Sequence, residues 1–147
     1  MKFIRRENRL HRILSIDYGN KRIGLALSDL MQIIAKPYKT IYNESHDQIL
    51  NELNIIIEEK SVKKIIVGLP LNLKGEFSEQ TNITIKFVDF LKENIKIEVL
   101  TYDERLSSIQ AKNSLVKQGV KTGHNKGVVD QTAAALFLQG YLDGLSN

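Results

Sequence analysis

The pattern of hydrophobic positions in the first third of the chain predicts three consecutive β-strands. Residues 12–17 are a short apolar run that ends at an acid, Asp17. Residues 22–28 alternate large apolar side chains with small ones, which is the two-residue period of a strand. A third strand is predicted over residues 33–42. Pro37 within it favours an edge position or a bulge, because proline cannot donate a ladder hydrogen bond.

Helical periodicity follows these strands and alternates with shorter apolar runs. A capping box, Ser45-x-x-Gln48, predicts the start of a helix whose apolar residues recur on one face. The later elements expected are a strand at 65–69, a helix at 79–93, a strand at 95–102, and helices at 106–117 and 129–143. The order βββαβαβαα predicts an α/β fold with a mixed sheet, in which an antiparallel meander is extended by parallel strands through helical crossovers.

Length and composition favour one cytoplasmic domain. A chain of 147 residues can bury enough surface to fold unaided, so a single domain over residues 1–147 is expected. The chain has no cysteine, which fits a reducing compartment and excludes thiolate metal sites. No apolar run approaches the roughly 20 residues that span a bilayer, and the basic start lacks the apolar core of a signal peptide. We therefore expect a cytoplasmic protein without membrane contact.

Positive charge is concentrated in two segments, although the net charge is only +4. Residues 1–28 hold seven lysines and arginines against two acids, and residues 105–126 hold five with no acid. Such segments are typical of a polyanion-binding surface, and an ordinary solvated surface is the alternative interpretation. Residues 1–11 are expected to be a short basic arm or a disordered end.

Asp17 is the first acid with a chemical interpretation. It ends a buried strand, where a carboxylate is costly unless it meets a cation, a donor or water. The turn that follows contains Gly19, which can approach a phosphate closely, and the cations Lys21 and Arg22. An acid beside a place for anions indicates metal-assisted chemistry on phosphates.

Two further acidic points lie at predicted helix starts. Asp103 and Glu104 occupy a strand–helix junction, where Asp103 or Ser107 could cap the helix and Glu104 could pair with Arg105 at the surface. Asp130 heads an apolar helical face that includes Ala134. It could be an N-cap, or close packing of this helix could bring it to the strand ends. Periodicity alone does not decide between these interpretations.

Four motifs join these acids along residues 12–143. They are IDYGNKRIGLALSD at 16–29, VGLPLNLKGE at 67–76, YDERLSS at 102–108 and VVDQTAAALFLQGYL at 128–142. In this order they resemble the YqgF/RuvX family of the RNase H-like superfamily, whose members are described as pre-16S rRNA nucleases or Holliday junction resolvases. One small departure is Ser108, where threonine is more usual in this family, and the loop at 121–126 is sparser in basic residues.

The resemblance implies an RNase H-like fold, with a five-stranded mixed sheet flanked by helices. It also implies that Asp17, Glu104 and Asp130 are catalytic, metal-binding carboxylates, with Asp103 as the alternative to Glu104. Adjacent strand residues point to opposite faces, so only one of that pair is expected to reach the metal. The implied nucleic-acid and phosphate contacts are Lys21, Arg22, Asn72, Arg105, Lys121 and Lys126.

The chemistry implied is hydrolysis of a phosphodiester. Three carboxylates suit Mg²⁺ or Mn²⁺, and two ions about 4 Å apart would activate water and stabilise the leaving oxygen. The expected activity is endonucleolytic processing of the 5′ end of pre-16S rRNA in ribosome biogenesis. The alternatives are a Holliday junction resolvase and a non-catalytic nucleic-acid-binding module of the same fold. The expected partner is structured RNA or branched DNA, and the protein is expected to be a monomer or homodimer.

A third class, the ATP-using actin-like or sugar-kinase-like proteins, also opens with an Asp-x-Gly hairpin. This chain is too short for their two-domain cleft.

Overall fold

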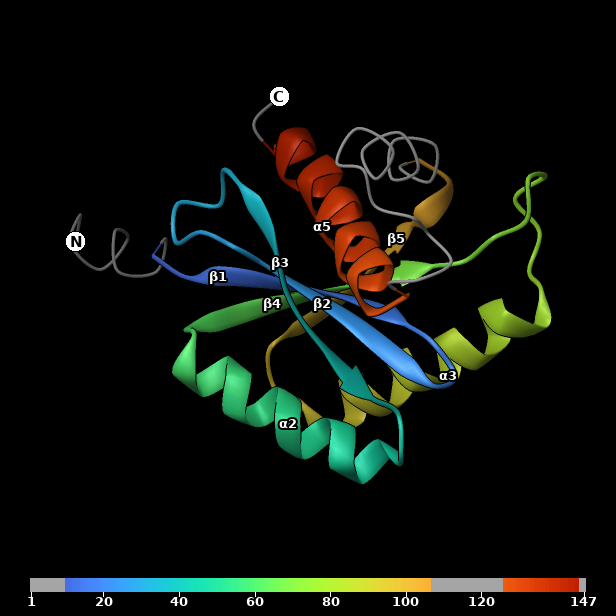
Figure 1. Cartoon of the computed structure of the whole chain (residues 1–147), viewed down its shortest axis with the longest axis horizontal. Helices are drawn as coiled ribbons and strands as arrows, with labels where there is room; N and C mark the ends of the chain where they lie inside the picture. Colours follow the sequence, from blue (N-terminus) through green and yellow to red (C-terminus); the bar gives the residue numbers. More distant parts are fainter. Residues whose placement is uncertain (1–9, 107–125, 146–147) are drawn as a thin grey trace.

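The described part of the chain contains a five-stranded mixed sheet in the spatial order β3-β2-β1-β4-β5 (Figure 1). The structure is a computed structural model that describes residues 10–106 and 126–145. Its strands are β1 (Arg12–Tyr18), β2 (Arg22–Ser28), β3 (Ala35–Tyr42), β4 (Val62–Leu69) and β5 (Glu98–Asp103). Its helices are α2 (His46–Glu59), α3 (Glu79–Asn94), the short 3₁₀ helix η1 (Glu104–Leu106) and α5 (Lys126–Leu145). Most of the helix predicted over 106–117 lies outside the described residues.

The pairing of the strands confirms the predicted α/β class. β1 pairs with β2, and β2 with β3, in antiparallel register. β4 joins the other side of β1 in parallel, and β5 adds in parallel to β4. The parallel strands follow helical crossovers, as helix-connected additions to a meander require. As a result β4 lies between the two strands, β1 and β5, that end at Asp17–Tyr18 and at Asp103.

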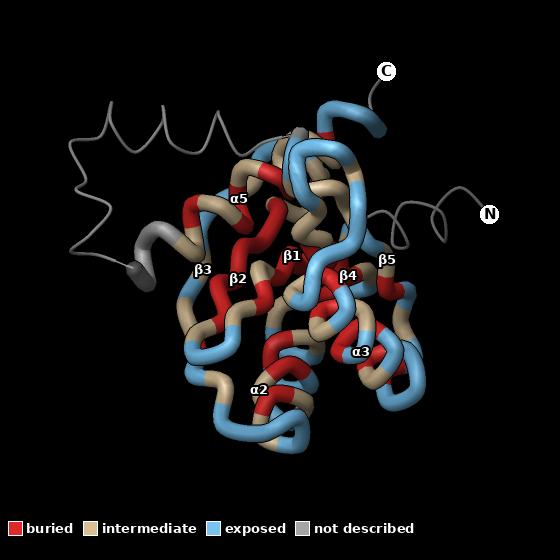
Figure 2. Tube along the Cα trace, turned by 90° about the vertical axis from the view of Figure 1, so that its right-hand side faces the viewer, coloured by how far each residue is buried: buried red, intermediate tan, exposed pale blue. Residues whose placement is uncertain are grey.

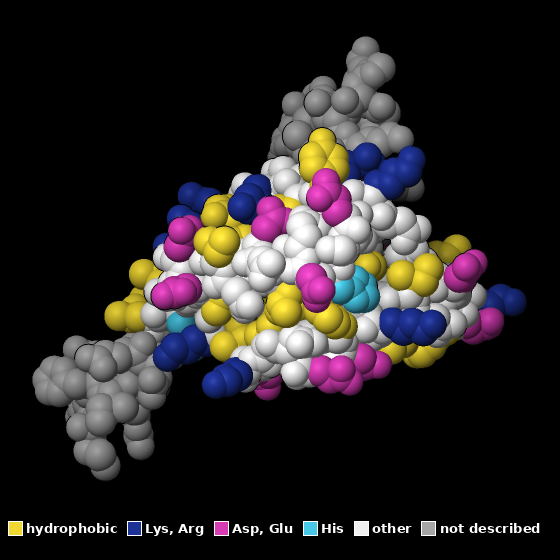
Figure 3. Space-filling view, turned by 90° about the horizontal axis from the view of Figure 1, so that it is seen from below, with side chains coloured by type: hydrophobic (Ala, Val, Ile, Leu, Met, Phe, Trp, Pro, Cys, Tyr) yellow, Lys and Arg dark blue, Asp and Glu magenta, His cyan; other side chains and the backbone are white. Residues whose placement is uncertain are grey.

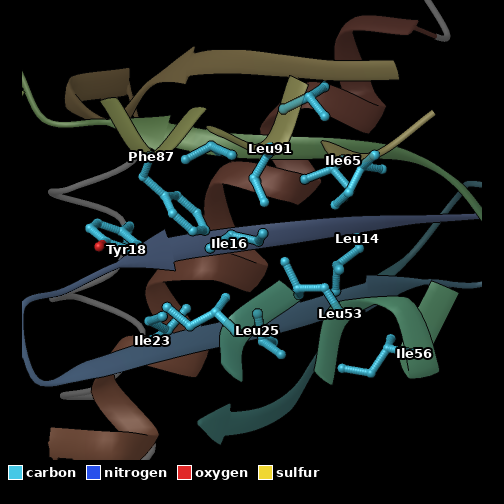
Figure 4. Packing of buried hydrophobic residues seen from close by; sticks show 14 of the residues in the cluster. Leu14, Ile16, Tyr18, Ile23, Leu25, Leu53, Ile56, Ile65, Phe87 and Leu91 are labelled. Atoms are coloured by element: carbon cyan, nitrogen blue, oxygen red, sulfur yellow. The ribbon is translucent and has the colours of Figure 1, made fainter. Parts of the chain in front are cut away.

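Helices cover the two faces of the sheet unequally. α2 and α3 lie along one face, and α5 crosses the other face over β1, β2 and β3 (Figures 1 and 2). The larger apolar cluster, shown in Figure 4, joins the sheet to α2 and α3. A smaller one joins the sheet to α5 and contains Ala26, Ala134 and Phe137. None of the described helices is long and apolar enough to cross a membrane.

Local signals fixed several element boundaries as predicted. Ser45 and Gln48 form a complete capping box at the start of α2. Pro37 lies on the edge strand β3, where the pairing register with β2 shifts, so both of its predicted consequences are present. β3 begins two residues later than predicted, because the Asp29 carboxylate accepts hydrogen bonds from the backbone amides of residues 31, 33 and 34 and holds them in a turn.

Strand β5 also begins later than predicted, at Glu98 rather than Ile95. Ile95 is instead the C-cap of α3, and its backbone amide donates to the carbonyl of Leu91 at 2.8 Å. Ile95 therefore caps the end of α3 and does not begin β5. α5 begins at Lys126, three residues before its predicted start.

Candidate functional site

Asp17 points to the face of the sheet that carries α5. Alternate residues of a strand share a face, and Ser15, two residues earlier, donates a hydrogen bond of 2.9 Å from its buried hydroxyl to the carbonyl of Ala134 in α5. The neighbouring Tyr18 turns to the opposite face, where its ring stacks on Phe87 of α3 at a centroid distance of 4.1 Å (Figure 4). This stack anchors the end of β1 and so fixes the direction of Asp17.

Glu104 reaches Asp17 across the intervening strand β4. A side chain at Gly68 of β4 would place its Cβ 2.6 Å from Oε1 and 2.8 Å from Cγ of Glu104. The glutamate therefore occupies the space above this glycine, and its carboxyl is hydrogen-bonded to that of Asp17. Such a bond between two carboxyls requires a proton on one of them.

Burial and mutual repulsion oppose the ionisation of both groups. Desolvation, the nearby charge of Glu104, the hydrogen bond to it and the charge of Asp130 together hold the pKa of Asp17 well above its usual value. The pKa of Glu104 is also raised, first by its burial and then by the charge of Asp103, against the opposing effect of its hydrogen bond with Asp17. The pair therefore favours neutralisation by a proton or by a cation.

Asp130 approaches the same region from α5. A Cβ on Gly24 of β2 would lie 2.7 Å from the Cβ of Asp130 and closer still to its backbone carbonyl, so the helix rests directly on this glycine. Gly24 is the register partner of Asp17. The Asp130 carboxylate also faces Arg22, with 3.5 Å between its Oδ2 and the arginine Nε. The N-cap interpretation of Asp130 is wrong, because α5 begins four residues earlier, at Lys126.

Asp103 points away from this group and binds Arg105. Its carboxylate accepts from Nη2 of Arg105 at 2.6 Å and from Nε at 3.0 Å, and its Oδ1 also accepts from the backbone amide of Arg105. These bonds hold the pKa of Asp103 below its usual value. Asp103 thus accepts a backbone bond at the short 3₁₀ helix η1, whereas most of the helix it was predicted to cap lies outside the described residues. The predicted surface pair of Glu104 with Arg105 is wrong, because Glu104 lies against Asp17 and Gly68. Of the two neighbouring acids, the structure brings Glu104 to Asp17.

The three carboxylates do not form a closed cage as they stand. Within residues 10–106 and 126–145, no three Asp, Glu or His side chains are gathered closely enough to hold a metal ion. The donor set nevertheless suits a hard divalent cation, since the carboxyls of Asp17 and Glu104 are in hydrogen-bonding contact and Asp130 is near enough for its charge to raise the pKa of Asp17.

The other predicted binding residues are spread around this group. Lys21 is exposed in the β1–β2 turn. Asn72 uses its Oδ1 to accept the amides of Lys74 and Glu76, so this atom closes a loop instead of facing the acids. Lys121 lies outside the described residues, and Lys126 is the first residue of α5. On the side that carries α2 and α3, acidic and basic side chains are interspersed (Figure 3).

Sequence reasoning missed the two glycines that position the acids, Gly24 and Gly68. The available signal was a glycine inside a strand, which often marks a close approach of another group. It also missed the role of Asp103 as the partner that orients Arg105.

The mixed sheet and the helix α5 across its first strands define an RNase H-like fold. Solved structures share this fold. They include a fowlpox virus resolvase with Holliday junction DNA (TM-score 0.58, 13% identity, covering 92% of this chain and 99% of that one). Another is Thermus thermophilus RuvC in complex with a Holliday junction substrate (TM-score 0.55, 12% identity, covering 93% of this chain and 96% of that one).

The family model described as "RuvX: Holliday junction resolvase" matches residues 11–144, and the chain belongs to this family of nucleases, which are hydrolases acting on ester bonds. Curated relatives carry a different description. Proteins of Clostridioides difficile (43% identical over 132 residues, 90% of this chain and 94% of the relative) and Acetivibrio thermocellus (42% over 134 residues, 90% and 95%) are each named "Putative pre-16S rRNA nuclease".

Proposed function

We propose that this protein is a metal-dependent endonuclease that processes the 5′ end of pre-16S rRNA in ribosome biogenesis. The observation that carries the proposal is the hydrogen-bonded contact of the buried Asp17 and Glu104 carboxyls, with Asp130 near enough for its charge to raise the pKa of Asp17. The choice of RNA rests on relatives more than 40% identical over nine-tenths of the chain that are named for this substrate. The structures bound to DNA junctions are 12–13% identical and support the fold alone.

In this proposal Asp17, Glu104 and Asp130 hold Mg²⁺ or Mn²⁺. A divalent cation bound there would supply charge stabilisation and an activated water for phosphodiester hydrolysis. The protein's own part is to keep the two carboxyls of β1 and η1 in hydrogen-bonded contact and to carry Asp130 towards them on a helix seated on Gly24. Burial of the pair excludes water from one side, so the carboxylates interact strongly with any cation that replaces the proton.

Arg22 is suited to bind the substrate phosphate in the same proposal. Its Nε lies 3.5 Å from the Asp130 carboxylate and makes no hydrogen bond in the described structure. A guanidinium can serve a carboxylate and then a phosphate with the same planar donors. Lys21 in the adjoining turn adds a second exposed cation, and Lys121 and Lys126 remain predicted contacts to the nucleic acid.

The test compares cleavage of two labelled substrates by the wild type and by Asp17→Asn, with Mg²⁺ or Mn²⁺. One substrate is a pre-16S rRNA fragment with its unprocessed 5′ end, and the other is a four-way DNA junction. Asp89→Asn is the matched control, because Asp89 is an exposed acid on α3 with no contact to the site. We expect metal-dependent cutting of the RNA by the wild type and the control, and its loss in Asp17→Asn. RNA that stays intact with both metals would contradict the proposal.

Holliday junction resolution is the second candidate, because the description of the matching family model names that activity. The same experiment separates the two. Symmetric cutting of the DNA junction, with the RNA left intact, would favour the resolvase. A homodimer in solution would support it further, since symmetric incision of a two-fold junction is served by two related active sites.

A further inference from the structure

A short hairpin loop rises from the end of β4, beside the acids. Leu71 and Phe77 form an isolated antiparallel bridge at its base. Inside it, the amide of Gly75 donates to the carbonyl of Asn72 at 2.9 Å, and the Asn72 side chain accepts the amides of residues 74 and 76. Gly75 takes a positive φ of 81°, which suits glycine. These bonds give residues 71–77, hereafter the β4 hairpin, a defined shape.

The position of the β4 hairpin places it next to the carboxylate pair. Its parent strand runs between β1 and β5, and Gly68 of that strand lies beneath Glu104. The hairpin projects beyond the sheet in Figure 1, and most of it is exposed in Figure 2. The hairpin therefore leaves the sheet at the same edge as Asp17 and Glu104.

Arg105, the residue that follows Glu104, contacts the β4 hairpin. Its Nη1 donates to the carbonyl of Leu73 at 3.5 Å, and a Cβ on Gly75 would lie 3.0 Å from the same atom. Asp103 in turn holds the guanidinium through the bonds described above. The orientation of the hairpin is thus linked to the segment that supplies Glu104.

At the tip of this hairpin the side chain of Leu73 is 96% exposed. Isolated exposed apolar residues are common and need no explanation by themselves. Here a large aliphatic side chain stands on a hydrogen-bonded loop that leaves the sheet at the edge where the acids lie, with Lys74 as its neighbour in sequence. Proteins that deform or read nucleic acids use such aliphatic side chains as wedges between bases.

We propose that Leu73 is a base wedge, which contacts an unpaired base next to the phosphodiester presented to Asp17 and Glu104. This inference rests on the proposed nuclease function and adds a substrate preference to it. The preferred substrate has a frayed, bulged or single-stranded nucleotide at that position, since a stacked and paired base offers no apolar face to the leucine. Lys74 and Arg105 are placed to meet the flanking phosphates.

The test measures binding of two RNA duplexes that differ at one position, in chelator so that nothing is cleaved. In one duplex a 2-aminopurine nucleotide is bulged and unpaired, and in the other the same nucleotide is base-paired. We expect the wild type to bind the unpaired RNA about fivefold to tenfold more tightly and to change its 2-aminopurine fluorescence. Leu73→Ser should reduce the preference to less than about twofold, whereas Leu73→Phe should retain it.

The control is Ile55→Ser, which removes another exposed apolar side chain, 55% exposed on α2, and should behave as the wild type. Wild-type preference in Leu73→Ser would overturn the wedge, and so would an equal loss of affinity for both RNAs. In either case the binding of RNA by the wild type would leave the nuclease proposal standing. Failure of the wild type to bind either RNA in chelator would overturn the wedge, whereas the nuclease proposal, which requires a metal ion, is decided by the cleavage test above.

Discussion

Replacing Gly24 by alanine tests whether the contact between β2 and α5 places Asp130. The added methyl group would lie 2.7 Å from the Cβ of Asp130 and closer still to its backbone carbonyl. Carbon atoms in ordinary contact are about 3.5–4.0 Å apart, so the helix must retreat by about 1 Å. The obstructing atoms include helix backbone, which cannot rotate aside as a flexible side chain could. Asp130 would therefore move away from Asp17.

Two magnitudes follow from this displacement. Forcing a methyl group into a packed interface costs about 1–3 kcal/mol of folding free energy. For a domain of this size that is a fall in melting temperature of roughly 3–10 °C. A displacement of about 1 Å at a catalytic group typically lowers the rate by about 100-fold. We therefore expect Gly24→Ala to fold, to melt earlier and to cleave RNA about 100-fold more slowly.

The assay pairs thermal denaturation with RNA cleavage, and the same helix offers a matched control. Apart from its own neighbours in the helix, Gly144 of α5 has no described atom within 4 Å of the Cβ it would gain, so Gly144→Ala should leave cleavage unchanged and should not lower the melting temperature. Wild-type melting and cleavage in Gly24→Ala would refute the close packing of α5 on β2. A lower melting temperature with unchanged cleavage would instead refute the importance of the position of Asp130.

Two further predictions concern the metal-free protein. The pKa values of Asp17 and Glu104 are raised in the folded state, so the folded protein binds protons that the unfolded chain releases. The free energy of unfolding should therefore fall as pH rises from the usual carboxyl range through the raised pKa values. Melting temperatures measured in chelator across this range should show the fall, and Asp17→Asn should flatten it; a wild-type curve without slope would contradict the raised pKa values. Ser15→Ala leaves a carbonyl of α5 without its buried hydroxyl donor and should cost about 1–2 kcal/mol, measured by urea denaturation, while an unchanged midpoint would argue against that hydrogen bond.

Much of the fold was predictable because its signals are local. Residues 22–28 were predicted as a strand and form β2 with the same bounds. The capping box at Ser45 and the bulge at Pro37 depend on side chains within a few residues of the backbone that they affect. The starts of β3 and β5 were predicted less well, because the apolar residues before each strand have another role. Ile33 and Ile34 belong to a turn held by Asp29, and Ile95 is the C-cap of α3.

The geometry of the candidate site was less accessible to sequence reasoning, because it depends on residues far apart in the chain. The three acids were selected from motifs, but nothing local distinguishes Asp103 from Glu104. Glu104 rather than Asp103 reaches Asp17 because Asp103 is bound to Arg105 and because Gly68 has no side chain in the space that Glu104 occupies. The helix start that excludes an N-cap role for Asp130 also lies in a segment without a clear apolar period.

The two glycines explain how one sheet face holds both a core and a polar group. On the face that carries α5, Ala26 and Ile66 pack in the apolar cluster, while the strand positions two residues closer to the acids are Gly24 and Gly68. The missing side chains make room for the backbone of α5 at one position and for Glu104 at the other. The acids therefore occupy volume that apolar side chains would otherwise fill, and their burial opposes the ionisation of Asp17 and Glu104. We therefore expect the metal-free fold to be less stable than the same fold with a cation at the proposed site.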